Sequence, residues 1–372
     1  MTDFALPENP GSYINWLSEQ TVSPNASVAA TIAIPVTHDW GPLGSEAGVQ
    51  RLTAFPEWET LFGDSPSDGR DAVLGGFLGP GINGFPGAGN VLTYRAATSS
   101  AARASKNLQN TDSPAVTALG ISGYYAGTRG NRIGLTVDED PANEDNQRLI
   151  VLLDGVIRER YVFPAGIASV LKELVNRRSK LIKATGTPVD TDPFAEITNS
   201  LLTGGNDGSS ITSTEYLAAL SALEFESFSV FAPANVTNGG ILTAIKTWTQ
   251  TMADDQRPVV SVLGGPANET YDAALTRTDT IRDPHIVSVG AGNFYDDYLG
   301  KQVCTAQIAP RIAGALAGLG EERALTFLKF GGLRLVGAAA IPTDLLSTAA
   351  AAGITCFRRT TGEDAELRIS KG

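Results

Sequence analysis

The second half of the chain alternates short apolar segments with helical ones, and this pattern limits the fold more than any other feature. Strand-like runs at residues 228–231, 258–263 and 285–289 are separated by segments with helical spacing at 240–252 and 269–281. Short apolar strands that alternate with helices form parallel sheets whose two faces are both covered. We therefore expect an α/β core here, a parallel sheet with helices on both faces.

The middle of the chain has a different pattern. Residues 149–163 read as a hairpin, because Asp154-Gly155 suits the type I′ turn that joins two antiparallel strands. Strand-like segments precede this hairpin and an amphipathic helix follows it at 167–178. We expect an inserted, mostly-β domain, which makes the whole chain a multidomain α+β protein.

These patterns divide the chain into five parts. The prolines at 7, 10 and 24 disfavour a helix near the start, and the glycine-rich loop at 204–210 marks the end of the insertion. Thr212 and Glu215 then form a capping box that starts a helix. The expected parts are an extended N-terminal arm (1–22), the N-terminal part of the core (23–112), the inserted domain (113–209), the α/β core (210–342) and the start of a C-terminal region (343–372).

Composition excludes several classes of partner. The chain has 372 residues and a formal net charge of −12, which disfavours direct binding to nucleic acid or to an anionic membrane. No apolar run is long enough to cross a membrane, and the first residues lack the pattern of a signal peptide. Cys304 and Cys356 are too few for a disulfide framework, so we expect buried free thiols and folding in a reducing cytoplasm.

The sequence offers little for hydrolytic chemistry. A Ser-His-Asp triad needs a histidine that reaches the serine, and His38 and His285 are the two histidines of the chain. His38 precedes a Trp-Gly-Pro turn and His285 opens an apolar strand, so we expect structural roles for both. Ser261 and Ser288 lie in strands without a nucleophile elbow.

Cofactor and metal motifs are equally weak. Residues 79–84 match a Gly-x-Gly-x-x-Gly string, but a helix precedes it and a strand follows, the reverse of a dinucleotide loop. The acidic cluster at 138–145 lacks the glycine and the terminal glutamate of a calcium loop, so we expect a solvated turn. We therefore predict no cofactor and no metal. The inserted domain also carries a basic run, which consists of Arg158, Arg160, Arg177, Arg178 and Lys180. This run is either a solvated face or pairs with an acidic patch on a neighbouring copy.

Residues 305–319 read as a buried helix with an apolar stripe and small residues such as Gly314. The segment resembles the helix that carries the nucleophilic serine of subtilisin-like proteases, in which a proline follows, as Pro310 does here. On that pattern the position of the nucleophile is Ala306, and a methyl group cannot attack a carbonyl. The resemblance implies a hydrolase-like scaffold without the chemistry, hence a structural protein and not an enzyme.

Several short motifs, in their order and spacing, resemble the contractile-tail sheath proteins of bacteriophages. The segment Pro10-Gly-Ser-Tyr-Ile-Asn15 is similar to the opening of that family, through Pro10, Gly11 and Tyr13. The turn His38-Asp-Trp-Gly-Pro42 resembles the family's Trp-Gly-Pro turn, with Trp40, Gly41 and Pro42.

Further landmarks follow in the same order. Leu61-Phe62-Gly63 and Val91-Leu-Thr-Tyr-Arg95 match the next two. In Tyr125-Ala-Gly-Thr-Arg-Gly-Asn131, the matching residues are Gly127, Gly130 and Asn131, while Ala126 stands where the family has proline. The helix with Pro310 and Gly314 falls where the family's subtilisin-like core ends.

The resemblance implies a structural subunit that polymerises as stacked hexameric rings around a tail tube and contracts to drive the tube through the host envelope for DNA ejection. The implied partners are other copies of the chain, the tail tube protein, the baseplate and the tail terminator proteins. The implied location is the virion, after assembly in the host bacterial cytoplasm.

Two alternatives stay open. One is the sheath of a phage-like contractile injection or secretion particle; the other, of a different class, is an α/β hydrolase or a nucleotide-binding enzyme. The resemblance also implies a C-terminal domain beyond Gly372. We accordingly expect the sheet edge at 366–370 to lack a partner strand in this chain.

Overall fold

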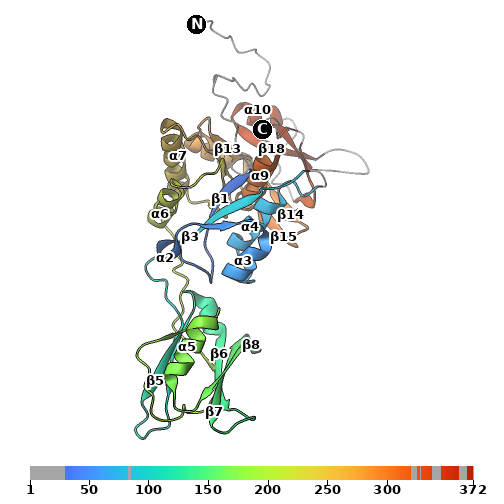
Figure 1. The fold of residues 1–372 in the computed structure, drawn as a ribbon. Helices are drawn as coiled ribbons and strands as arrows, with labels where there is room; N and C mark the ends of the chain where they lie inside the picture. The colour runs from blue at the N-terminus through green and yellow to red at the C-terminus, as the bar shows by residue number, and fades with distance from the viewer. Residues whose placement is uncertain are drawn as a thin grey trace.

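The computed structural model describes residues 30–82, 85–319, 325–326, 328–336, 345–359 and 367–371. They form two bodies, which Figure 1 shows one above the other: a larger α/β core and a smaller body that we name the module, residues 105–201. The chain enters the module after the first strands of the core and returns to the core afterwards. The expected extended arm at 1–22 lies outside the described residues, and so do Pro10, Gly11 and Tyr13.

A nine-stranded sheet forms the centre of the core. Its order is β16-β19-β18-β13-β12-β11-β1-β3-β2, and the run from β18 to β3 is parallel throughout. The strands are β1 (Thr31–Val36), β2 (Gln50–Leu52), β3 (Asn90–Arg95), β11 (Val230–Phe231), β12 (Val260–Leu263), β13 (Ile286–Val289), β16 (Lys329–Phe330), β18 (Ile354–Arg359) and β19 (Leu367–Lys371).

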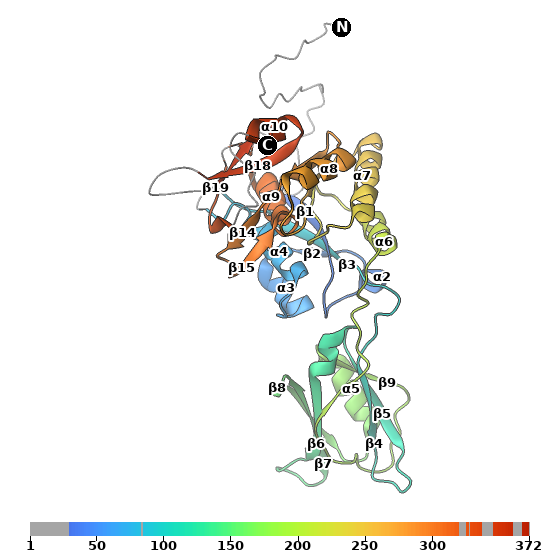
Figure 2. The ribbon, with the colours of Figure 1, turned by 180° about the vertical axis from the view of Figure 1, so that it is seen from behind.

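Helices cover both faces of this sheet, as Figures 1 and 2 show. Alternate residues of β1 serve the two faces: Ile32 and Ile34 pack with the apolar residues of α4 and α9, whereas Ala33 packs with those of α6 and α7. The core helices are α2 (Gly44–Ala47), α3 (Phe55–Phe62), α4 (Asp68–Leu78), α6 (Ser213–Leu223), α7 (Gly239–Asp254), α8 (Tyr271–Ile281), α9 (Thr305–Leu319) and α10 (Leu346–Ala351). The expected parallel sheet with helices on both faces is therefore confirmed; its likeness to subtilisin stays a prediction.

The module is mostly β, as the sequence pattern indicates. Two antiparallel sheets, ordered β4-β5-β9 and β10-β6-β7-β8, enclose an apolar cluster that helix α5 also covers. Its elements are β4 (Ser105–Gln109), β5 (Thr117–Gly123), η1 (Thr128–Arg132), β6 (Ile133–Glu139), β7 (Asn146–Leu153), β8 (Val156–Pro164), α5 (Ala168–Arg178), β9 (Ile182–Thr185) and β10 (Ile197–Leu201). Because β4 pairs with β5, we propose that the inserted domain starts before the expected residue 113.

Two features of the core differ from expectation. A small sheet of β14 (Asn293–Asp296), β15 (Lys301–Cys304) and β17 (Leu333–Val336) was not foreseen. The edge at 366–370 does not lack a partner, because β16 pairs with β19 on the side away from β18. The backbone N–H of Ile369 also donates to the carbonyl oxygen of Leu328 at 3.1 Å. The expectation of an unpaired β19 is therefore wrong.

One smaller expectation is confirmed, since Cys304 and Cys356 are buried free thiols. Within the part of the chain that is described, no helix is long and apolar enough to cross a membrane.

Candidate functional site: the junction between core and module

The junction is where most of the described motif residues of the sequence meet. The turn after β1 carries His38, Trp40 and Pro42, the end of β3 carries Arg95, and the segment 125–131 lies in the module between β5 and β6. The two connecting segments pair with each other, since Ala102 and Asn206 exchange backbone hydrogen bonds at 2.9 and 3.0 Å. The chain therefore crosses the junction as a paired ribbon and not as two independent linkers.

Arg95 is the centre of the junction. Its side chain is 1% exposed and its guanidinium reaches three carbonyl oxygens. Nε donates to His38 at 2.9 Å, and Nη1 donates to Gly41 and Ala126 at 2.8 Å each. Burial lowers the pKa of Arg95 to about 10, while nearby carboxylates including Asp207 act to raise it, so the group stays charged at neutral pH. One side chain of the core thus ties the turn after β1 to the segment of the module between β5 and β6.

Gly127 brings the two segments into contact. Its φ is +137°, and an added Cβ would lie well inside contact distance of the carbonyl oxygen of Asp39. A residue with a side chain would therefore meet both a backbone clash and an unfavourable backbone conformation. Gly41 is similarly tight against Phe62, and Gly130 is tight against Ala104. Gly127 therefore lies where the backbones of core and module come close, while Gly41 and Gly130 make room for neighbouring side chains.

Two polar side chains extend this contact. Arg129, almost fully buried, donates to Ser65 Oγ at 2.8 Å and pairs with Asp64 at 2.7 Å. Its hydrogen bond holds the pKa of the Asp64 carboxyl below its usual value. Asn131 binds both backbone groups of Gly205, donating to its oxygen at 2.9 Å and accepting from its nitrogen at 2.8 Å. Arg129 thus ties the module to the core, and Asn131 ties the module to the segment through which the chain leaves it.

Trp40 crosses from one body into the other. It belongs to the turn after β1, yet it packs in the apolar cluster of the module and is 4% exposed. Its ring meets Tyr125 edge to face, with centroids 5.5 Å apart. Pro42 in the same turn is also buried. A core residue thus forms part of the module's own interior.

The junction does contain a histidine next to a serine. His38 Nδ1 lies 2.7 Å from Ser67 Oγ, its Nε2 lies 2.9 Å from the carbonyl oxygen of Phe62, and Asp39 is 3.2 Å from Nε2. However, burial lowers the pKa of His38 to about 4, and a general base for neutral pH needs a pKa near 7. Ser67 Oγ also caps α4 by accepting from Arg70 N. The geometry fits a structural hydrogen bond better than an activated serine.

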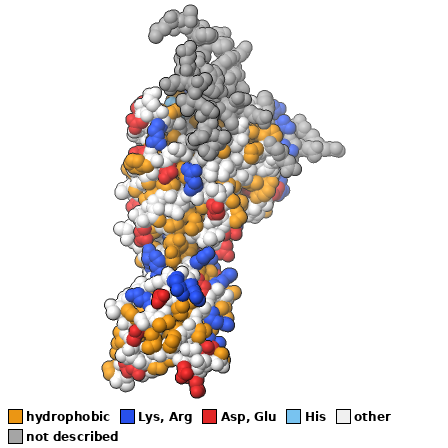
Figure 3. All heavy atoms as spheres, viewed as in Figure 1, with side chains coloured by type: hydrophobic (Ala, Val, Ile, Leu, Met, Phe, Trp, Pro, Cys, Tyr) orange, Lys and Arg blue, Asp and Glu red, His pale blue; other side chains and the backbone are white. Residues whose placement is uncertain are grey.

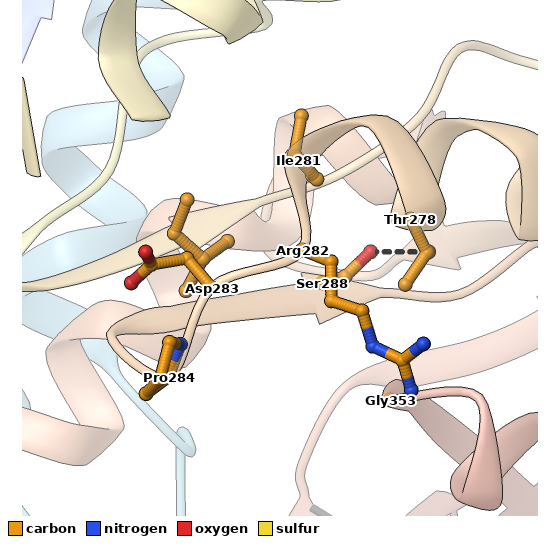
Figure 4. A pocket seen from close by; sticks show the side chains of 8 residues that line it. Thr278, Ile281, Arg282, Asp283, Pro284, Ser288 and Gly353 are labelled. Atoms are coloured by element: carbon orange, nitrogen blue, oxygen red, sulfur yellow. Dashed lines mark hydrogen bonds between the residues drawn. The ribbon is translucent and has the colours of Figure 1, made fainter. Parts of the chain in front are cut away.

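His285 has no serine partner among the described residues. Its sequence neighbours Pro284 and Ile286 line a hollow of about 350 Å³ between α8, β13 and the turn before β18, drawn in Figure 4. Inside, Ser288 Oγ is engaged by Thr278 Oγ1 at 2.7 Å and by Arg277 at 3.0 Å. His285 Nδ1 instead faces Asp283 at 3.3 Å. The hollow therefore has no base poised to activate Ser288.

The start of α9 is closely packed. Ala306, where a subtilase nucleophile would be, is 2% exposed and donates its N–H to Gly265 at 3.0 Å. Thr305 Oγ1 accepts from the N–H of Gly265 at 2.7 Å. Pro310 lies inside the helix, and Gly314 faces the backbone of Gly76 in α4 so closely that a Cβ would not fit. These positions join α9 to its neighbours.

Arg311 is a buried cation that the sequence reading missed. It pairs with Asp296 at 3.0 Å, each side chain being 2% exposed. The guanidinium also donates to the carbonyl oxygens of Gly79 at 3.0 Å and of Gly331 at 2.6 Å. Burial lowers the pKa of Arg311, and Asp296 opposes that shift. A signal was present, because Arg311 is the one charged residue in the sequence of α9.

This contact also explains the glycine string at 79–84. The carbonyl oxygens of Gly79 and Pro80 accept from Arg311, whereas a phosphate loop would offer N–H groups. Asn83 and Gly84 lie outside the described residues. Across the part of the chain that is described, no group of three or more His, Cys, Asp or Glu side chains could hold a metal ion.

Comparisons with known proteins agree with the sheath resemblance. Residues 209–370 match the family model of the phage tail sheath protein central domain. A tail sheath protein assigned to Enterococcus phage phiEF24C is 27% identical over 177 residues, which is 47% of this chain and 30% of that protein. The chain thus spans about a third of the length of this curated relative.

Two solved structures share the fold. The sheath tail protein from Desulfitobacterium hafniense superimposes with a TM-score of 0.70 at 20% identity, over 97% of this chain and 74% of that one. A sheath tail protein from Listeria innocua gives 0.67 at 19% identity, over 93% and 71%. At these identities the likeness concerns the fold alone, a mixed α/β multidomain architecture.

Proposed function

We propose that this chain, which carries the central domain of the phage tail sheath family, is a structural subunit of a contractile phage tail sheath. The observation that carries the proposal is the match of residues 209–370 to that domain. The sheath-like fold over nearly the whole chain supports it. The subunit would be a component of the virion.

The finer features of this function are part of the proposal. Copies of the chain form hexameric rings that stack around the tail tube between baseplate and terminator proteins. Contraction then drives the tube through the host envelope for DNA ejection, and assembly takes place in the host bacterial cytoplasm. The tightly packed junction supports a contraction in which each subunit moves as a rigid body. The contacts of Arg95 and Gly127 hold the module and the core together, so the junction can transmit force without acting as a hinge.

The role we propose is non-enzymatic, and the core is of the subtilisin type without a nucleophile. Ala306, Pro310 and Gly314 are packing positions of its helix α9. The domain division and the family motif residues belong to the same proposal: Trp40, Gly41, Pro42, Gly127, Gly130 and Asn131 join the module to the core.

A phage-like contractile injection or secretion particle would use the same subunit architecture and remains the alternative. A hydrolase or nucleotide-binding enzyme has no specific support among the described residues. Among the described residues, the one serine–histidine contact, at His38, has a buried imidazole with a pKa of about 4. The glycine string turns its carbonyl oxygens, not its N–H groups, to a cation.

Immunogold electron microscopy tests the proposal. Antibodies against the purified chain are applied to particles released from the cells that produce it. We expect gold along the whole outer wall of a contractile tail, in its extended and contracted forms. Labelling confined to one end of the tail, or absent from particles whose tails are intact, would contradict a sheath subunit. An injection particle would show the same wall labelling without a DNA-filled head.

A further inference from the structure

The module carries opposite charges at its two ends. Figure 3 shows basic side chains gathered where the module adjoins the core and acidic ones at its far tip. The strand register explains the separation, because Val156 of β8 pairs with Leu153 of β7, which pairs with Ile133 at the start of β6. The turn at 140–145 lies at the opposite end of the same strands. Strands of this length separate the two ends by about 20 Å.

A surface that we name the basic patch begins at the end near the core and extends to the middle of β8, where Arg160 pairs with Ile150. It consists of Arg158, Arg160, Arg178 and Lys180, all exposed, beside the apolar Val156 and Ile157. Within the described ranges none of the four cations lies within ion-pair distance of a carboxylate. Glu159, which lies between two of them, is already occupied by Ser179 Oγ at 2.6 Å and by the N–H of Lys180 at 2.9 Å. The positive charge of the patch is therefore available to a partner.

Among the described residues, no element covers the apolar part of the patch. Val156 is 54% exposed and Ile157 is 51% exposed, at the start of β8. In the described sheet this strand is an edge, paired with β7 alone. Large apolar side chains that remain exposed beside unpaired cations are typical of an interface whose rim is polar.

The opposite end forms the acidic tip, which consists of Glu139, Asp140, Glu144 and Asp145. The neighbouring Asp138 is neutralised by Arg148, at 2.5 Å, and this hydrogen bond lowers the pKa of the Asp138 carboxyl. In the part of the chain that the structure describes, none of the four acids of the tip forms an ion pair like that of Asp138 with Arg148. The turn is held by local bonds, such as that from the N–H of Ala142 to Asp140 at 3.3 Å.

We propose that the basic patch of one copy binds the acidic tip of the module of a second copy, head to tail. This inference rests on the proposed sheath function, in which copies of the chain contact one another. A two-fold contact through either surface would place like charges together, which is unfavourable. A head-to-tail contact instead pairs opposite charges, and such heterologous contacts build rings or helices.

Cysteine cross-linking between two tagged populations tests the contact. One population carries Arg160→Cys and the other carries Glu144→Cys, and disulfide formation is followed on non-reducing gels. The native thiols Cys304 and Cys356 should add little to the cross-linking. Burial raises the pKa of both, so little of the reactive thiolate forms at neutral pH. We expect the mixed pair to cross-link at least tenfold faster than Arg160→Cys with itself. The same margin should hold against Arg160→Cys mixed with Leu217→Cys, an exposed position on α6. Equal rates for all three pairs would overturn the proposal.

A charge swap provides the second measurement. Arg158→Glu in the first population should slow the mixed cross-link about tenfold, and Asp145→Lys in the second should restore it. If the arginines served only to keep the edge strand β8 from pairing, neither change would alter the rate. Immunogold labelling of tails does not depend on this contact. Labelled tails without the cross-link would refute the contact alone, and the cross-link with unlabelled tails would refute the sheath function.

Discussion

The core and the module bury different kinds of polar group. Among the described residues, the buried charges lie in the core and at the junction: Arg95, Arg129, Glu269, Asp296 and Arg311. Away from the junction, the buried polar groups of the module are neutral: Asn110, Ser122, Gln147 and Ser179. The module is thus a β structure held by its apolar cluster, whereas the core uses buried arginines to fix irregular segments.

This difference shows where the structure resists deformation. Two of the buried arginines bind backbone carbonyl groups of segments that lack regular pairing, as Arg311 does with Gly79 and Gly331. Arg95 does the same with His38, Gly41 and Ala126. A buried charge that loses its partners is costly, so these contacts hold each segment in one arrangement. Four changes, from the largest expected effect to the smallest, test whether buried contacts dominate over exposed ones.

Removal of the buried core cation should have the largest effect. Arg311→Met leaves Asp296 buried without a counter-charge and should lower the free energy of unfolding by about 4 kcal/mol. Urea denaturation measures the loss. The matched control is Arg334→Met, which breaks an exposed pair with Asp297 and should cost less than about 1 kcal/mol. Similar losses for both variants would contradict the distinction between buried and exposed pairs.

A methyl group at the junction should come next. Gly127→Ala forces a side chain against the carbonyl oxygen of Asp39 at a φ of +137° and should cost about 3 kcal/mol. Gly186→Ala is the control, because its φ is +74° but its Cβ would meet no atom within 4 Å. It should cost about 1 kcal/mol. A Gly127 variant no less stable than the control in thermal unfolding would show that the junction is not tightly packed.

Mild acid should weaken the junction through His38. The unfolded chain takes up a proton near the usual pKa of 6.5, whereas burial lowers the pKa to about 4 in the folded state. The stabilisation is therefore complete above pH 6.5 and is lost as the pH falls toward 4, by about 2 kcal/mol at pH 5. His38→Gln should flatten the stability profile between pH 7 and 5. An unchanged slope in that variant would assign the effect to other groups.

Loss of an exposed cap should have the smallest effect. Thr212 and Glu215 form the capping box at the start of α6. Thr212→Ala should cost about 1 kcal/mol, while Thr214→Ala, an exposed site that supplies only its backbone N–H to the box, should be nearly neutral. Circular dichroism during thermal unfolding compares the two. A loss as large as that for Arg311→Met would reverse the ranking of buried and exposed contacts.

Local signals predicted much of this fold. The turn Asp154-Gly155 joins β7 to β8 with a positive φ at both residues, as a type I′ turn requires. The capping box at Thr212 is formed, and the apolar runs at β12 and β13 are parallel strands. Each of these features depends on residues close together in the sequence, or on an apolar run that is buried on both faces.

Features set by distant partners were not predicted. β14 pairs with β17, some forty residues later, and its residues Asn-Phe-Tyr-Asp do not alternate between apolar and polar, although their burial does. Arg95 was noticed as the end of a motif, but its three carbonyl partners come from two other segments. Glu269 and Arg277 are of charged residue types that usually lie at the protein surface, although their ion pair at 2.8 Å is buried. Such contacts follow from the tertiary arrangement.

Electron cryo-microscopy of the tail in extended and contracted forms tests the central claim most directly. We predict a helical wall in which each repeat accommodates both bodies of the chain. The module and core should keep the same relative orientation in the two forms, held by Arg95, Gly127 and Asn131. A wall into which the chain does not fit would contradict the sheath function. A module that rotates against the core between the two forms would contradict the locked junction.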